Sequence, residues 1–303
     1  QYIEFSTTVG TKAPVESADQ ISEFAVWGYY GQNGAYTDVF GQTGTEVRGE
    51  NGAWVYDNLK KWQFGVPYNF YAVYPADAVH GMSSSDASGG APYISIPDYD
   101  VQNKDRDLMF ASVEGMVQPE GSVPSPVQLE FCHLLSRVDF VAKTDPLTLE
   151  NLPDFNAEVT EAKLYGMPKS GDLSLENFDP ADMSTVVWQP RNPTTQDDLF
   201  RHISGQYKLN TEGTSLFGEL FMLPAATLSG YVLEIHWTVT AQKDDTPMTK
   251  SQIISLSSPA VLNWSAGSRY RYTFTISDTD HILFEVPTVT PWDDASGGII
   301  VVE

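Results

Sequence analysis

The stretch VQLEFCHLLSRVDFVA, residues 127–142, decides the fold and is the densest apolar run near the middle of the chain. In its first half apolar residues alternate with others, a period of two that is typical of a half-buried strand, at Val127, Leu129 and Phe131. In its second half they continue on the opposite parity, at Val138, Phe140 and Ala142. This shift predicts a β-bulge near His133–Leu135, with a single helical turn as the competing interpretation.

A segment rich in proline, glycine and serine, Gln118–Pro126, comes directly before this stretch and resembles a linker. We therefore expect two domains, residues 1–126 and residues 127–303. Short apolar and aromatic runs separated by glycine and proline turns occupy both parts, and no long amphipathic helix is evident. This pattern predicts an all-β protein of two β-sandwich domains with mostly antiparallel strands.

The composition is that of a folded, acidic protein. The 303 residues are 12% aromatic and 19% charged, with a formal net charge of −23. Nucleic-acid binding requires clustered lysine and arginine, so this charge argues against a nucleic-acid partner. It fits a protein of the cell surface or the extracellular space. No apolar run reaches the length of about 18 residues that a membrane-spanning helix needs.

The chain begins at Gln1 without a methionine or a signal peptide, and we expect a processed or trimmed form. Cys132 is the only cysteine, so the core rather than disulfides stabilises the fold, and we expect Cys132 to be buried and inert. A cysteine-rich zinc site is excluded for the same reason.

The sequence offers no motif for catalysis. Cys132 and His133 are neighbours on a strand and point to opposite faces, and the motifs G-x-S-x-G and H-E-x-x-H are absent. The segment Asp98–Asp107 resembles a calcium loop but has Asn103 where glycine is required and Met109 where glutamate is required, so we expect a solvated acidic loop. We expect no enzymatic activity, catalytic residue, cofactor or metal.

The seven tryptophans allow two interpretations. Together with tyrosines they could line a glycan-binding surface, or they could pack in the core. Their positions within or beside expected strands favour the core. The tryptophans are Trp27, Trp54, Trp62, Trp188, Trp237, Trp264 and Trp292.

The first expected strand, Tyr2–Val9, could be detachable. Its sequence alternates, with one face made of Ile3, Phe5, Thr7 and Val9. A flexible polar connection, Gly10–Ala18, follows and contains Lys12. If a trypsin-like protease cut there, the first strand could leave and open an apolar groove.

Near the other end of the chain, four consecutive residues are apolar, so both faces of a strand there would be apolar. They are Ile299, Ile300, Val301 and Val302. A solvated edge strand would alternate, so this segment needs a partner on each face. The preceding pair Gly297–Gly298 provides a hinge. These features suit strand exchange between subunits. The alternative is an ordinary two-domain β-protein whose terminal strands are simply members of its sheets.

Several segments in order along the chain resemble the fimbrillin-like (FimA/Mfa-type) pilins and pilus-associated lipoproteins of Bacteroidales bacteria. They cover the chain from end to end, and it is their order that is specific. The resembling segments are Thr11–Ala13, Phe24–Tyr30, Tyr68–Pro75, Asp107–Ala111, Leu129–Phe140, Leu164–Gly171, Gly218–Pro224, Trp264–Ile276 and Trp292–Glu303.

The resemblance implies two tandem transthyretin-like β-sandwich domains and export as an outer-membrane lipoprotein, with a lipidated cysteine upstream of Gln1. Family pilins are cut by an Arg/Lys-specific protease in the loop after the first strand. Here the scissile bond would join Lys12 to Ala13, and the removed strand would be Tyr2–Val9. The strand given to the next subunit would be Ile299–Glu303.

The resemblance therefore implies a structural subunit of a cell-surface fimbria that supports adhesion. The implied partners are like pilin subunits, a trypsin-like maturation protease and a host protein or glycan receptor. Anchor and tip members of the family keep their first strand or lack a donor strand, so these roles stay open, as does that of a surface glycan-binding lipoprotein. The apolar C-terminal segment favours a subunit of the fimbrial stalk.

Overall fold

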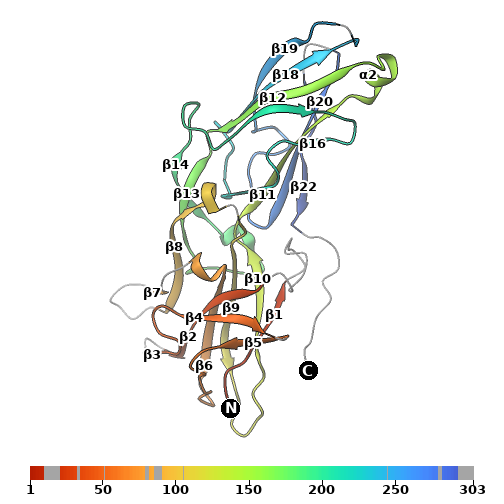
Figure 1. The fold of residues 1–303 in the computed structure, drawn as a ribbon. Helices are drawn as coiled ribbons and strands as arrows, with labels where there is room; N and C mark the ends of the chain where they lie inside the picture. The colour runs from red at the N-terminus through yellow and green to blue at the C-terminus, as the bar shows by residue number, and fades with distance from the viewer. Residues whose placement is uncertain are drawn as a thin grey trace.

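The computed structural model describes residues 1–9, 21–32, 35–50, 52–78, 82–84, 91–104, 106–243, 245–278 and 282–292. These residues form four β-sheets in an elongated molecule, with the N-terminal half at one end and the C-terminal half at the other (Figure 1). The helices are short: η2 (Ala76–Ala78), α1 (Val101–Lys104), α2 (Pro146–Asn151) and η3 (Met183–Thr185). No helix in these ranges is long and apolar enough to cross a membrane. The expected all-β, mostly antiparallel fold is confirmed.

An eight-stranded sheet forms the N-terminal half, with the strand order β1-β10-β9-β6-β2-β4-β5 and with β3 paired to β2. Its ladders are antiparallel except for the pair of β1 and β10, which is parallel. The strands are β1 (Phe5–Val9), β2 (Glu23–Gln32), β3 (Ala35–Asp38), β4 (Thr45–Glu50), β5 (Ala53–Tyr56), β6 (Pro67–Tyr74), β9 (Met109–Val117) and β10 (Val127–His133).

Two sheets form the C-terminal half. In the first, β11 and β20 pair in parallel at the centre, and short antiparallel strands flank them. Its strands are β11 (Ser136–Thr144), β16 (Thr214–Ser215), β17 (Leu220–Met222), β20 (Ser268–Ile276), β21 (Leu283–Phe284) and β22 (Thr288–Pro291). The second sheet contains β12 (Asn156–Tyr165), β15 (Arg201–Lys208), β18 (Val232–Thr240) and β19 (Met248–Ser255), all antiparallel.

A fourth sheet joins the two halves. Its central pair is β8, from the N-terminal half, and β13, from the C-terminal half, with Gly171 opposite Tyr99 and Leu173 opposite Ile96. The halves are therefore connected by strand pairing as well as by the chain. The strands of this sheet are β7 (Met82–Ser84), β8 (Pro92–Asp100), β13 (Pro168–Ser174) and β14 (Trp188–Pro193).

The stretch 127–142 is two strands that belong to different sheets. β10 lies in the N-terminal sheet, β11 lies in a C-terminal sheet, and the chain bends at Leu134 and Leu135, both fully buried. The shift of the apolar positions therefore comes from this crossing between sheets, and neither the expected β-bulge nor the helical turn is present there. Because β10 pairs with β1 and β9, a division near residue 134 suits the pairing better than one at residue 126. The division into domains itself stays a prediction.

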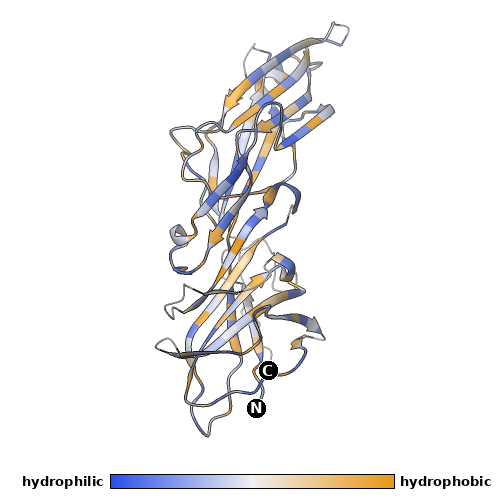
Figure 2. Cartoon of the chain, turned by 90° about the vertical axis from the view of Figure 1, so that its left-hand side faces the viewer, coloured by the Kyte–Doolittle hydropathy of each residue, from blue (hydrophilic) through white to orange (hydrophobic). Residues whose placement is uncertain are grey.

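The buried apolar side chains form two separate cores. The smaller, the first-strand core, consists of Ile3, Phe5, Ile21, Phe24, Val26, Phe40, Val47, Tyr56, Trp62, Tyr68, Phe70, Ala72, Met109, Ala111, Val127, Leu129 and Phe131. The larger, the main core, runs through both halves and includes Trp27, Tyr71, Phe110, Phe140 and Trp264. Figure 2 shows the alternation of apolar and polar residues along the strands that lets one chain supply both.

Strands β2, β6 and β9 form the wall between the two cores. Successive side chains of a strand point to opposite faces of its sheet. In β2, Phe24 and Val26 belong to the first-strand core, whereas Trp27 belongs to the main core. In β6, Phe70 belongs to the first-strand core and Tyr71 belongs to the main core. A change on one face of this wall therefore leaves the other face packed.

Two segments rich in glycine or in polar residues contain regular structure. The glycine-rich region 31–52 contains β3 and β4, whose side chains are mostly exposed and whose order comes from pairing with β2. The segment Asp98–Asp107, expected as a solvated acidic loop, holds the end of β8 and then α1. Its last residue, Asp107, is buried.

Candidate functional site

The first strand lies at one edge of the N-terminal sheet. β1 runs parallel to β10 over five residue pairs, from Phe5 opposite Val127 to Val9 opposite Phe131 (Figure 1). Only β10 pairs with it as a neighbouring strand in the described part of the chain. An edge strand shares one ladder rather than two, so its backbone is held by fewer hydrogen bonds than that of a central strand.

A second set of backbone contacts holds the residues before β1. The amide of Ile3 donates to the carbonyl oxygen of Lys60 over 2.8 Å, and the amide of Trp62 donates to that of Gln1 over 3.2 Å. Tyr2 forms an antiparallel bridge with Lys61. Residues 1–3 thus contact the segment that follows β5, and residues 5–9 pair with β10. The first strand therefore connects β10 to the segment after β5, two parts of the sheet that no ladder joins directly.

The inward side chains of the first strand are buried. Ile3 is 1% exposed, Phe5 is 6% exposed and Thr7 is 9% exposed, as the alternation of the sequence predicts. Phe5 lies in a cage of aromatic rings whose centroids are 5.6 to 6.5 Å from its own. The rings are Phe24, Phe40, Tyr56 and Phe70. The groove under β1 is therefore shaped around an aromatic residue.

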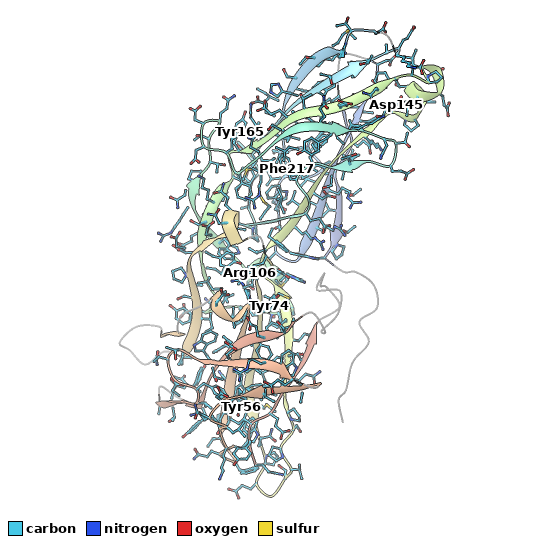
Figure 3. All side chains as sticks on the ribbon, in the orientation of Figure 1. Tyr56, Tyr74, Arg106, Asp145, Tyr165 and Phe217 are labelled. Atoms are coloured by element: carbon cyan, nitrogen blue, oxygen red, sulfur yellow. The ribbon has the colours of Figure 1, made fainter. Side chains whose placement is uncertain are left out.

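Two polar contacts join the first strand, residues 2–9, to β5, which lies at the other end of the sheet's strand order. The Tyr56 hydroxyl donates to the carbonyl oxygen of Ile3 over 2.9 Å and accepts from the Lys60 amide over 3.2 Å. The Trp54 Nε1 donates to the Thr7 hydroxyl oxygen over 3.1 Å. Burial raises the pKa of Tyr56, and the hydrogen bond from Lys60 partly offsets this rise. Figure 3 labels Tyr56 in the N-terminal half.

The remaining residues of the expected site lie outside the described residues. They are Lys12 and Ala13 of the expected scissile bond, and Ile299, Ile300, Val301 and Val302 of the expected donor strand. The backbone of Val9 is described as the end of β1, and its side chain is not. The structure thus describes the groove and the strand that fills it. The cleavage site and the donor stay predictions.

A buried column of side chains that no sequence pattern indicated lies where the two halves meet, the junction column of Asp107, His133 and Trp292. The Nδ1 of His133 lies 2.6 Å from an Asp107 carboxylate oxygen, although the two are not aligned as a hydrogen bond. The imidazole stacks on Trp292 with centroids 4.1 Å apart and an interplanar angle of 12°. These residues are far apart in sequence and no motif links them, so only the fold brings them together.

A cavity of about 710 Å³ opens next to this junction. It begins beside the end of β10 and is lined mainly by apolar side chains, among them Phe131, Trp188, Trp264 and Val289. Cys132 also lines it and is partly exposed, which corrects the expectation that this cysteine is buried.

The tryptophans are core residues. Six of the seven are at most 6% exposed, and Trp54 is partly buried against Phe24 with ring centroids 4.9 Å apart. This arrangement does not favour a glycan-binding surface made of tryptophans. Among the described residues, no group of three or more His, Cys, Asp or Glu side chains is placed to hold a metal ion.

Comparisons with known proteins agree with this fold. A family model described as fimbrillin-like matches residues 7–292. A fimbrial protein from Bacteroides vulgatus has a similar crystal structure, with a TM-score of 0.64 and 16% identity over 96% of this chain and 99% of that one. A candidate cell adhesion protein from Bacteroides ovatus aligns with a TM-score of 0.55 and 16% identity over 98% of this chain and 99% of that one. No curated protein sequence matches the chain.

Proposed function

The chain belongs to the fimbrillin-like family, and we propose that it is a fimbrial subunit that assembles by protease-triggered strand exchange and supports adhesion. Membership of the family supports a structural role at the cell surface, in contact with other fimbrial subunits. The family is one of fimbrial structural and adhesion proteins, not a family of known enzymes. The mechanism, the protease and the receptor belong to the proposal.

The observation that supports strand exchange best is the separate core under β1. Ile3 and Phe5 belong to the first-strand core, and the main core contains none of the described side chains of the first strand. The strand also lies at an edge, in the one parallel pair of its sheet. Its loss would open one groove and leave most of the packed interior of the molecule in place.

In the proposed mechanism, a trypsin-like maturation protease cuts between Lys12 and Ala13. The first strand, no longer tethered, leaves the groove with the inward side chains Ile3, Phe5 and Thr7. A strand from a second copy, Ile299–Glu303, then enters. Its backbone would complete the ladder of β10, and its apolar side chains would fill the groove.

The direction of assembly follows from the burial of the first strand. Each fully buried apolar side chain is worth about 1.5–3 kcal/mol, so exposing Ile3 and Phe5 alone costs about 3–6 kcal/mol. An incoming strand recovers part of this free energy. In the uncut chain, the tethered first strand competes within the same molecule and blocks the groove. Cleavage is therefore the step that makes assembly favourable.

Donation from one subunit to the next is a heterologous contact, and such contacts build open filaments. We propose accordingly that the chain reaches the surface as an outer-membrane lipoprotein precursor and is matured into an extracellular fimbria. We also propose that two β-sandwich domains, joined by the sheet of β8 and β13, form each subunit.

Limited digestion of the purified chain with a trypsin-like protease tests this function. N-terminal sequencing identifies the cut, and size-exclusion chromatography follows the product. We expect a dominant cut after Lys12, release of the first strand and growth of oligomers. Deleting Ile299–Glu303 leaves the cut chain monomeric. Oligomers that still grow from the deleted chain overturn the donor assignment, and a cut chain that keeps its first strand indicates an anchor or tip subunit.

A further inference from the structure

Two adjacent lysines lie where the first strand enters its groove. The carbonyl oxygen of Lys60 accepts from the amide of Ile3, and Lys61 bridges Tyr2. The Lys61 Nζ lies 5.8 Å from the centre of the Tyr2 ring. Neither lysine forms a salt bridge with any residue in the described ranges. When the first strand leaves, Tyr2 leaves with it and uncovers this positive charge.

This pair is unusual in the chain. The sequence has 40 acidic residues against 17 lysines and arginines, and only here are two lysines or arginines adjacent. The charge of Arg48 in β4, by contrast, is already balanced, because this residue lies within 4.0 Å of three carboxylates, those of Glu46, Glu50 and Asp57. Two copies with a net charge of −23 repel each other, so a local positive site at the groove matters for their encounter.

The apolar residues of the proposed donor strand have carboxylates both before and after them in the sequence. Asp293 and Asp294 precede its apolar residues, and Glu303 follows them. If the segment entered the groove in the direction of β1, the aspartates would arrive at the side of Lys60 and Lys61. If it entered in the opposite direction, Glu303 would arrive there. In either direction, a carboxylate of this end of the chain would therefore arrive on the side of the two lysines.

We propose that Lys60 and Lys61 form an electrostatic recognition element for the acidic end of the incoming strand of a second copy. This inference rests on the proposed strand exchange and adds the residues that select and steer the donor. The lysines are partly or fully exposed, so their attraction acts mainly on the rate of encounter. Salt screens such exposed charges over about 8 Å at physiological ionic strength.

The test uses the full chain with a recognition site for a sequence-specific protease between Lys12 and Ala13, so that cutting spares Lys60 and Lys61. The cut chain is captured on a sensor surface at low density, which keeps the copies apart. The probe is a synthetic peptide of residues 293–303. The variant Lys60→Gln/Lys61→Gln is compared with Lys208→Gln/Lys243→Gln, which removes the same charge from exposed positions in the C-terminal half.

We expect the Lys60→Gln/Lys61→Gln chain to bind the peptide about tenfold more slowly at low salt and at the same rate as the control at high salt. Peptides with Asp293→Asn/Asp294→Asn or with Glu303→Gln reveal which end meets the lysines, because only the relevant change slows binding to the parent chain. Equal rates for both lysine variants at every salt concentration overturn the inference and leave strand exchange intact. A peptide that never binds the cut parent chain overturns strand exchange itself.

Discussion

The first-strand core and the main core differ in the kind of strand that covers them. The main core lies between sheets whose central strands, such as β11 and β12, pair on both sides. The first-strand core is closed on one side by β1, an edge strand that contributes Ile3 and Phe5. Both cores consist of buried apolar side chains. The difference is that one core depends on a strand at the edge of its sheet, the strand whose exchange we propose.

This difference suits the strand exchange that we propose, because a stable protein would have to lose one strand without unfolding. Strands β2, β6 and β9 supply side chains to both cores, so they stay packed on one face when the other face is opened. Proteins open locally in cooperative units whose free energies are lower than that of global unfolding. We expect β1 to be such a unit and the main core to be the most stable part of the molecule.

The largest effect is expected from truncating one large side chain in each core. Phe5→Ala and Phe140→Ala should each cost about 3–5 kcal/mol, because each removes a buried aromatic ring. Hydrogen exchange should separate them, with faster exchange at β1 and β10 for Phe5→Ala and at β11 and β20 for Phe140→Ala. Equally faster hydrogen exchange at β11 in both variants would show that the two cores open as a single cooperative unit.

A smaller effect is expected at the junction column. Asp107→Ala leaves the buried imidazole of His133 without its 2.6 Å polar neighbour and should lower the free energy of unfolding by about 1–3 kcal/mol, measured by urea denaturation. The double variant Asp107→Ala/His133→Phe removes both polar groups and should recover much of this loss. A double variant less stable than Asp107→Ala would contradict this account of the column.

The contact between Tyr56 of β5 and Ile3, just before β1, gives a smaller effect still. Tyr56→Phe leaves the Ile3 carbonyl and the Lys60 amide without their partner and should cost about 1–2 kcal/mol. In a chain cut after Lys12, the measurement is the release rate of a labelled first strand, which should rise about tenfold. Tyr71→Phe is the matched control, because its hydroxyl faces Tyr29 in the main core and should not change the rate.

The smallest effect is a dependence on alkaline pH. Burial raises the pKa of Tyr56 in the folded chain above its usual value of about 10. The stabilisation is therefore complete below about pH 10 and is lost as the pH rises toward the folded-state pKa. Release of the first strand from the cut chain should accelerate above about pH 10, and less so in Tyr56→Phe. Identical pH profiles would exclude Tyr56 as the group responsible.

The sequence predicted the part of the site that depends on local alternation. The inward face of Ile3, Phe5 and Thr7 follows from the period of a strand, and the structure confirms it. The sequence also located an irregularity near His133–Leu135. Its cause, a crossing between two sheets, depends on which strands pair, and a single strand does not encode its partners.

The features that were missed depend on distant residues. β3 and β4 are largely exposed, and their order comes from pairing with β2, so the glycine-rich segment gave no apolar signal. Asp107 belongs to an acidic run, which predicts a solvated side chain. It is buried because His133, at the end of β10, lies against it in the fold. The parallel register of β1 and the cage around Phe5 are likewise products of tertiary structure.

The most direct test of strand exchange is a disulfide trap between two chains. Both carry Cys132→Ser and the specific protease site between Lys12 and Ala13. The acceptor has Glu130→Cys, an exposed position of β10 opposite Thr8, and the donor has Val301→Cys. After mild oxidation, we expect a covalent acceptor–donor pair, identified by mass, only when the acceptor is cut. No such pair, or equal amounts with cut and uncut acceptor, would contradict the claim that the donor takes the place of the first strand.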